Sequence, residues 1–325
     1  MKAILCERLG DPSVLKLVDL PQPAPKPGEV LVRVKAAALN FPDVLTVAGS
    51  YQHKPSLPFV PGMEAAGEVV ALGEGVTGLK AGQRIMFGAK TGCFAEYAIT
   101  RPGEAIALPD DWSFDEGAAW QIGAKTAYHA LVHRGRLQPR EVLLVHGAAG
   151  GMGLAAVQLA KSLGARVIAT GSDNDRLAEV RRLGADLVIN YKESDFVPAV
   201  KSMTDGRGAD VVFDPVGGEV LERSLRCTAF GGRLLVVGFT SGGPTEVKSN
   251  HVLIKGLSLL GVRAGEASRR DPKIAAEYAR ELPKLAAAGI MRPHISHRFA
   301  LEQVQQGMAT LTERKVVGKV VLQIG

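Results

Sequence analysis

The chain has 325 residues, of which 46% are hydrophobic and 22% charged, and its net charge is +6. This length suggests two domains with buried cores, and the composition excludes a largely disordered protein. No apolar run approaches the roughly 18 residues that span a bilayer. The opening MKAILCERLG has too few apolar residues for a secretory signal, so we expect a cytoplasmic protein.

The three cysteines, Cys6, Cys93 and Cys227, lie far apart and form no CxxC pair, which favours reduced thiols over disulfides. The sequence pI is about 9.2. The basic residues are scattered, whereas a nucleic-acid-binding protein gathers them in a stripe with aromatic residues. A nucleic-acid partner is therefore disfavoured, and the basic surface suits an anionic cofactor.

The elements expected in chain order change in character near residue 122. Residues 1–120 are rich in Pro and Gly, and their short strand-like runs indicate an all-β, barrel-like domain. These runs are EVLVRVKAAAL, EAAGEVVALG, QRIMFGA and CFAEYAI. Beyond them, strand candidates alternate with helical patterns, as in βαβ units with a parallel sheet. These candidates are VLLVH, RVIAT, DLVIN, DVVFD, RLLVVG and LSLLG.

The tail returns to β character, because HISHRF and GKVVLQI flank a helix near residues 301–313. We therefore predict a doubly wound parallel-sheet domain at residues 122–262. A β-barrel domain is predicted from residues 1–121 and 263–325, so that the tail rejoins the first domain. The fold class is α/β.

A glycine-rich turn lies within LLVHGAAGGMGLAAVQLAKSLGARVIATG, residues 143–171. Ala148, Gly150 and Gly153 occupy the GxGxxG positions, with Gly151 and Met152 between the glycines. Small residues let the backbone approach a pyrophosphate, and the N-terminal N–H groups of the following helix hold the anion. The strand before and the helix after the turn are the context that this motif requires. The segment predicts a dinucleotide site.

The choice of dinucleotide depends on the end of the second strand, where an NAD site places Asp or Glu. Thr170-Gly171 occupies that position, and neither residue is acidic. Ser172 and Arg176 follow, and a hydroxyl and a guanidinium suit a 2′-phosphate. NADPH is therefore the expected cofactor.

Further residues bear on this choice in both directions. Tyr191 ends the next strand and supplies another hydroxyl donor. Asp173 and Asp175 argue against a phosphate unless their carboxylates point away. The alternative is that Arg176 is an ordinary surface residue in the first turn of a helix.

Motifs along essentially the whole chain carry a family resemblance. The sequence resembles the medium-chain dehydrogenase/reductase superfamily, specifically its zinc-free quinone oxidoreductase branch of zeta-crystallin-like proteins. The resemblance implies a GroES-like catalytic domain, a Rossmann cofactor domain, NADPH-dependent reduction, and homodimers or tetramers. The matching stretches are LNFPDVLTVAGSY, PFVPGMEAAGEVVALGEGV, CFAEYA, KTAYHAL, HGAAGGMGLAAVQLAKSLGA, GADLVINY, GADVVFDPVGG, GGRLLVVGF and NHVLIKG.

The zinc ligands of the related alcohol dehydrogenases are missing from the corresponding positions. Asn40 stands where the first Cys would be, and Met63 replaces the His of the GHE motif, leaving Glu64. Residues 118–126, where the last ligand belongs, contain no Cys, His, Asp or Glu. We expect no metal.

The resemblance places Asn40, Asp43 and Tyr51 at the substrate and nicotinamide region. A quinone accepts hydride with little help, because the developing charge spreads into a ring that becomes aromatic, so positioning and a dry pocket suffice. The Asn40 amide would donate to the substrate carbonyl or anchor the cofactor. Tyr51 would stack on the ring or donate its O–H. The predicted function is NADPH:quinone reduction.

Two alternatives remain open. Reduction of an enone or enoyl thioester leaves an enolate that needs a proton, and Tyr51 is a fair acid for that step. Leu45 favours this alternative, because some bacterial quinone reductases carry a second aromatic residue there. The other alternative is a non-enzymatic cofactor-binding or RNA-binding protein, as for some relatives. The simplest interpretation of Tyr51 is that its side chain only packs against the wall of the cleft.

The remaining cofactor contacts follow from motifs at the carboxyl ends of strands and from the tail. We interpret Cys93 as a small buried residue, since no His lies nearby in sequence to activate it. The residues expected near the cofactor are Thr126, Gly217, Gly238, Phe239, Asn250 and Arg314.

Overall fold

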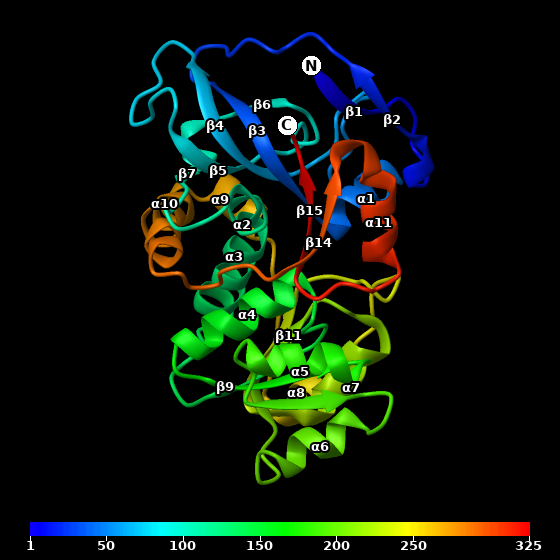
Figure 1. Ribbon diagram of the computed structural model, residues 1–325. Helices are drawn as coiled ribbons and strands as arrows, with labels where there is room; N and C mark the ends of the chain where they lie inside the picture. The colour runs from blue at the N-terminus through cyan, green and yellow to red at the C-terminus, as the bar shows by residue number, and fades with distance from the viewer. The chain divides into compact units, whose positions relative to one another are not determined.

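The computed structural model describes residues 1–325 and divides them into two compact units. The first unit comprises residues 1–122 and 292–325, and the second comprises residues 123–291. Both ends of the chain lie in the first unit (Figure 1). The early boundary differs by one residue from the predicted one, whereas the late boundary follows residue 291 instead of residue 262.

The late boundary shifts because two helices expected in the β domain pack within the second unit. These helices are α9 (Ala264–Arg270) and α10 (Pro272–Ala287). Tyr278 on α10 hydrogen-bonds through its hydroxyl to His129 Nδ1 at 2.7 Å, and Tyr128 O–H donates to Glu277 Oε1 at 2.8 Å. Tyr128 ends α3 (Gln121–Tyr128), so α10 is held to the start of the second unit.

The first unit is built on a seven-stranded sheet with the order β14-β15-β3-β4-β5-β7, in which β6 pairs with β3. All pairings are antiparallel except that of β14 with β15. A separate antiparallel pair joins β1 (Lys2–Cys6) to β2 (Leu15–Asp19). The other strands are β3 (Val30–Leu39), β4 (Glu64–Leu72), β5 (Arg84–Gly88), β6 (Tyr97–Thr100), β7 (Ala105–Ala107), β14 (Ile295–Ala300) and β15 (Lys319–Gln323). The helices are α1 (Phe41–Val47), α2 (Phe114–Ala118) and α11 (Val304–Thr312).

The central strand β3 is buried on both faces, which explains its nearly continuous apolar run. Val30, Val32 and Val34 lie in the core with Phe87 and Phe94. The predicted strands at residues 29–39, 64–73 and 83–89 are therefore confirmed, with ends within one or two residues of those expected.

The second unit contains a six-stranded parallel sheet with the order β10-β9-β8-β11-β12-β13. The strands are β8 (Val142–Val145), β9 (Arg166–Gly171), β10 (Leu187–Asn190), β11 (Ala209–Asp214), β12 (Thr228–Val236) and β13 (Ser258–Gly261). The connecting helices are α4 (Gly151–Ser162), α5 (Asn174–Arg182), α6 (Phe196–Ser202), α7 (Gly218–Cys227) and α8 (Ser249–Lys255). This strand order reverses between β8 and β11, so a ligand is expected outside their carboxyl ends.

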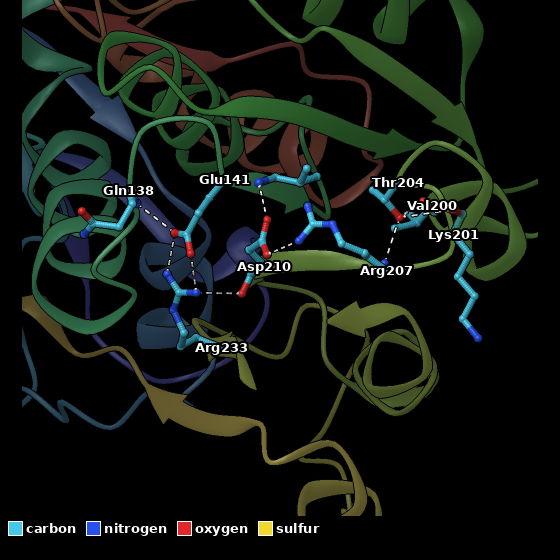
Figure 2. A network of polar contacts seen from close by, with 10 residues as sticks. Gln138, Glu141, Val200, Lys201, Thr204, Arg207, Asp210 and Arg233 are labelled. Atoms are coloured by element: carbon cyan, nitrogen blue, oxygen red, sulfur yellow. Dashed lines mark hydrogen bonds and ion pairs between the residues drawn. The ribbon is translucent and has the colours of Figure 1, made fainter. Parts of the chain in front are cut away.

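The opposite, amino-terminal edge of this sheet is closed by an ion-pair network (Figure 2). Arg233 of β12 bonds both carboxylate oxygens of Glu141, at 2.9 and 2.6 Å, and also the Asp210 carbonyl. The Asp210 carboxylate accepts from Val142 N–H at 2.8 Å and from Arg207 at 3.1 Å. The network ties the starts of β8 and β11 to Arg233 of β12, on the side of the sheet away from the carboxyl ends of the strands.

Two further sequence expectations concern cysteines and membrane spans. Cys6, Cys93 and Cys227 are all buried and none is in a disulfide. No helix is long and apolar enough to span a membrane.

Candidate active site

The first unit places Asn40 and Asp43 at the start of α1. Asp43 Oδ2 accepts the backbone N–H of Asn40, the N-cap residue, at 2.8 Å, which forms part of a capping box at the start of the helix. The Asp43 side chain is only 1% exposed. Burial raises the pKa of Asp43 to about 7, although the N–H groups of Asn40 and Gly62 oppose the shift. Asp43 is therefore a helix cap whose carboxyl group titrates near neutrality.

The side chain of Asn40 is fixed by a buried ion pair between Lys319 and Glu64. Lys319 Nζ donates to Asn40 Oδ1 and to Glu64 Oε1, both at 2.6 Å. Asn40 Nδ2 donates to Glu64 Oε1 at 3.0 Å and to the Ala38 carbonyl at 3.4 Å. Both ends of the Asn40 amide are thus engaged, and its orientation is set by the charges on either side.

Glu64 also binds the chain where it leaves the first unit. Its second oxygen, Oε2, accepts the Ile122 backbone N–H at 2.8 Å. This one carboxylate therefore joins β4 to Asn40, to β15 through Lys319, and to α3 through Ile122. Sequence reasoning noted Glu64 but missed Lys319. The available signal was a lysine at the start of the apolar run KVVL.

Cys93 lies in the same interior, and its side chain is fully buried. Burial, followed by the charges of Asp43 and Glu64, raises the pKa of the Cys93 thiol well above its ordinary value. A thiol that resists ionisation is a poor nucleophile, in agreement with the interpretation of Cys93 as a small buried residue.

Tyr51 follows α1 and is half-buried. Its backbone N–H donates to the Leu45 carbonyl at 3.1 Å, and Ser50 N–H donates to the same oxygen at 2.9 Å. The turn after α1 thus fixes the backbone of Tyr51 against Leu45. The structure brings together Asn40 and Asp43 at the first turn of α1, and places Tyr51 beyond its last turn.

These residues do not fit a catalytic zinc ion. Both oxygens of Glu64 already accept hydrogen bonds, and the Lys319 ammonium beside Glu64 repels a cation. Asn40 and Met63 supply neither a thiolate nor an imidazole. No group of three or more His, Cys, Asp or Glu side chains is arranged to hold a metal ion.

The second unit places the glycine-rich turn directly after β8. Gly150 precedes α4, and no side chain caps that helix, so its first N–H groups are available to an anion. A Cβ atom on Gly153 would lie 2.5 Å from the Gly147 carbonyl oxygen and 2.7 Å from Ala148 Cα. Only glycine allows this approach of helix and turn. The turn and the first residues of α4 therefore pack so closely that a side chain at position 153 is excluded.

The ends of β9 and β10 bring Ser172, Arg176 and Tyr191 together. The Arg176 guanidinium lies 3.5 Å from Ser172 Oγ. Tyr191 is 43% exposed, and its backbone N–H donates to the Gly171 carbonyl at 3.0 Å. The Asp173 carboxylate caps α5 by accepting Arg176 N–H at 3.0 Å, and lies 3.5 Å from Arg176 Nε. That charge is thus partly offset by Arg176 itself.

The loops after β11 and β12 pack on one another, and bring Gly217, Gly238 and Phe239 together. A Cβ atom on Gly217 would lie 2.8 Å from the Phe239 ring, and one on Gly238 would lie 3.2 Å from the Pro215 carbonyl oxygen. Asp214 Oδ1 fixes the first loop by accepting the N–H groups of Val216 and Gly217. Its Oδ2 is buried without a hydrogen-bond partner, and burial raises the pKa of Asp214.

The other expected cofactor contacts are more dispersed. Thr126 is half-buried on α3, Met152 and Gly151 form the first turn of α4, and Asn250 is exposed in the first turn of α8. Arg314 is exposed beyond α11, in the first unit, whereas the other expected cofactor residues lie in the second unit. Sequence reasoning also missed His146, a buried polar residue between β8 and the glycine turn.

Comparison with known proteins matches both units. Residues 26–110 match the alcohol dehydrogenase GroES-like domain, and residues 151–281 match the zinc-binding dehydrogenase domain. The chain is 36% identical to quinone oxidoreductase-like protein 2 of Mus musculus, over 99% of this chain and 92% of that protein. A homologue of that protein from Nematostella vectensis is also 36% identical, over 99% of this chain and 88% of the relative.

Solved structures agree with these matches. Escherichia coli quinone oxidoreductase complexed with NADPH aligns with a TM-score of 0.89 at 31% identity, over 99% of this chain and 100% of that chain. A probable oxidoreductase from Mycobacterium abscessus aligns with a TM-score of 0.89 at 39% identity, over 99% and 98% of the two chains. The two units and these matches define an NAD(P)-dependent oxidoreductase of the medium-chain dehydrogenase/reductase superfamily. Within that superfamily, the chain belongs to the zinc-free quinone oxidoreductase branch.

Proposed function

We propose that this protein is a zinc-independent NADPH:quinone reductase. The observation that carries the choice of NADPH is the group of Ser172, Arg176 and Tyr191 at the ends of two adjacent strands. A hydroxyl and a guanidinium 3.5 Å apart can both donate to a 2′-phosphate, and β9 ends in Thr170 and Gly171 without an acid that would prefer a ribose hydroxyl.

The cofactor's remaining groups have matching positions in the second unit. The uncapped start of α4, from Gly150 to Gly153, would hold the pyrophosphate. The packed loops at Gly217 and Gly238 would bind along the carboxyl edge of the sheet, with Thr126 near the nicotinamide. NADPH supplies the hydride when bound. The structure of the Escherichia coli relative complexed with NADPH supports this assignment.

On the substrate side, the residues of the first unit suit positioning. The Asn40 amide is bonded to Glu64, Lys319 and the Ala38 carbonyl, so we assign it to holding α1 in place. Asp43 caps the same helix. Tyr51 then contributes an aromatic face and a hydroxyl group. A quinone fits this set, because it needs orientation and exclusion of water more than a strong acid.

The second candidate is a reductase of enones or enoyl thioesters. Position 45, whose carbonyl accepts the Tyr51 backbone N–H, carries an aliphatic leucine instead of a second aromatic residue. In this reaction the Tyr51 O–H would deliver the proton that completes the reduced product.

The test compares cofactors and substrates side by side. We expect wild-type protein to oxidise NADPH in preference to NADH with a simple benzoquinone, and faster than with a short enoyl-CoA. Arg176→Ala should raise the KM for NADPH by at least about tenfold and that for NADH little, because one charge-assisted contact is lost. Equal changes for the two cofactors would remove the 2′-phosphate assignment.

Tyr51→Phe separates the two substrate classes. It should spare quinone reduction if Tyr51 only positions the ring. A selective loss of enoyl-CoA reduction would make Tyr51 the proton donor and favour the second candidate. A uniform loss would mean that Tyr51 is a packing residue.

We also propose that the protein forms homo-oligomers through the second unit. Phe230, Leu253 and Ile254 are 83%, 82% and 71% exposed, and Leu259 lies on β13, the edge strand. The Phe230 ring lies over Gly256, directly after α8, the helix that carries Leu253 and Ile254. An exposed apolar surface beside an open strand edge suits a second copy of the chain. Leu253→Asp should convert an oligomer to a monomer in sedimentation, whereas Leu17→Asp, on β2, should not.

A cytoplasmic location remains part of this proposal. The three buried, unpaired cysteines support a reducing compartment.

A further inference from the structure

His146 occupies the junction between β8 and the glycine-rich turn, and its ring is almost fully buried. Its Nδ1 lies 2.8 Å from Thr170 Oγ1, and its Nε2 lies 2.8 Å from Ser224 Oγ. Thr170 belongs to β9 and Ser224 to α7. One imidazole therefore links three elements of the second unit.

The direction of each hydrogen bond follows from Ser224. Its hydroxyl proton is donated to the Val220 carbonyl at 2.6 Å, so Ser224 Oγ can only accept from the imidazole. Nε2 is then the protonated nitrogen, and Nδ1 accepts the Thr170 O–H. Burial lowers the pKa of His146 to about 3, so the ring is neutral. A neutral ring has one N–H, so it donates one hydrogen bond to Ser224 and accepts one from Thr170.

The two residues joined by Nδ1 each adjoin a part of the proposed cofactor site. His146 immediately precedes Gly147, where the pyrophosphate turn begins, and Thr170 immediately precedes Gly171 and Ser172. The Thr170 carbonyl also accepts Ala148 N–H at 3.3 Å. The side chain and the backbone of Thr170 thus bind His146 and the glycine-rich turn, one residue beyond Val145 and Ala169, the last paired residues of β8 and β9.

The third link holds the ring itself in place. Ser224 anchors Nε2 from α7, and Phe196 packs edge-on at 5.0 Å between ring centres. The ring is thus held toward Thr170, and the bond to Thr170 adds a side-chain link between the ends of β8 and β9 just past their backbone ladder.

We propose that His146 is a positioning residue for cofactor choice: through Thr170 it fixes the spacing between the pyrophosphate turn and the group that receives the 2′-phosphate. This inference rests on the proposed use of NADPH. NADPH must satisfy both phosphate positions at once, whereas NADH carries only the pyrophosphate. Loss of the link should therefore weaken NADPH binding selectively.

The experiment measures dissociation constants for NADPH and NADH by isothermal titration calorimetry, with the melting temperature recorded for each variant. Thr170→Val keeps the volume and removes the hydroxyl, and should weaken NADPH binding about fivefold to tenfold and NADH binding less than about twofold. Thr170→Ser retains the hydroxyl and should keep the wild-type ratio. Ser224→Ala removes the anchor of Nε2 from α7 but leaves the Thr170 hydroxyl in place, so it should shift the ratio in the same direction by a smaller factor, below about threefold.

The outcomes separate this inference from the proposed function. If wild-type protein prefers NADPH but Thr170→Val leaves the ratio unchanged, the role of His146 is overturned while the use of NADPH stands. If Thr170→Val and Ser224→Ala weaken NADPH and NADH binding equally, the cluster is only structural and the inference fails. If wild-type protein binds both cofactors equally, the proposed function fails and this inference with it. Should Thr170→Val not fold, His146→Gln, which also breaks the link, gives the same readout.

Discussion

Each unit buries a polar cluster beside its candidate residues, and the two clusters differ in charge. In the first unit, Lys319 and Glu64 form an ion pair in which the side chains are 8% and 1% exposed. In the second, His146, Thr170 and Ser224 form a neutral chain of hydrogen bonds. Asp214 is a buried carboxyl group elsewhere in the second unit. Burial raises its pKa, which favours the neutral form.

The difference teaches where each unit keeps its charges. In the first unit the charges of Lys319 and Glu64 are buried, and the Glu64 carboxylate bonds to groups of α1, α3 and β15. The second unit keeps Arg176 and Asp173 at the partly exposed ends of its strands, where a phosphate can reach them. The inward charges stabilise structure, whereas the outward ones are available for binding.

The largest expected effect comes from breaking the inward ion pair. Lys319→Met should destabilise the first unit by about 3–5 kcal/mol, because Glu64 is left as an unpaired buried charge. Hydrogen exchange of the β3 and β15 amides measures this change. Lys16→Met is the matched control, since the Lys16–Glu7 pair is exposed and should cost less than about 1 kcal/mol. Equal costs would show that burial of the pair does not matter.

The next effect is a pH dependence in the first unit. The folded state holds the Asp43 proton up to a pKa of about 7, whereas the unfolded chain releases it near 3.8. Between these values the folded state binds more protons, so stability should fall as pH rises, by up to about 1.4 kcal/mol per pH unit. Exchange of the β4 amides, corrected for intrinsic rates, reports the slope. Asp43→Asn should remove it.

The second unit should respond to pH in the opposite sense. The pKa of His146 is about 3 in the folded state and 6.5 in the unfolded state. Between these values the unfolded chain binds more protons, so stability should fall as pH decreases from 6.5, again by up to about 1.4 kcal/mol per pH unit. Exchange of the β8 amides from pH 4.5 to 6.5 tests this. If stability changed with pH in the same direction in both units, the predicted difference between the buried groups of the two units would be wrong.

The smallest effect concerns an outward charge. Asp173→Asn keeps the oxygen that caps α5 and removes the carboxylate 3.5 Å from Arg176. NADPH binding should tighten by about twofold in a calorimetric titration at low salt, with NADH binding unchanged. Weaker NADPH binding would mean that Asp173 orients Arg176 instead of competing with the phosphate.

The amino-acid sequence by itself determined the elements and the cofactor turn. Strands β3 and β8 and helix α4 lie where apolar runs and glycines predicted them, because period, turn residues and helix ends are local properties. The spacing of Gly150 and Gly153 likewise predicted the close contact of turn and helix, since the contact with Gly147 is formed within seven residues. The alternation of strand and helix patterns along the chain, together with the family motifs, indicated the fold class.

Only the tertiary structure decided which distant residues meet. Lys319 reaches Glu64 across 255 positions and His146 reaches Ser224 across 78, and no local pattern encodes such contacts. The second unit likewise extends to residue 291, because Tyr278 and Glu277 bond to α3 and the residue that follows it. Hydrophobic periodicity says which side chains are buried. The partners of the polar ones depend on how the chain folds back on itself.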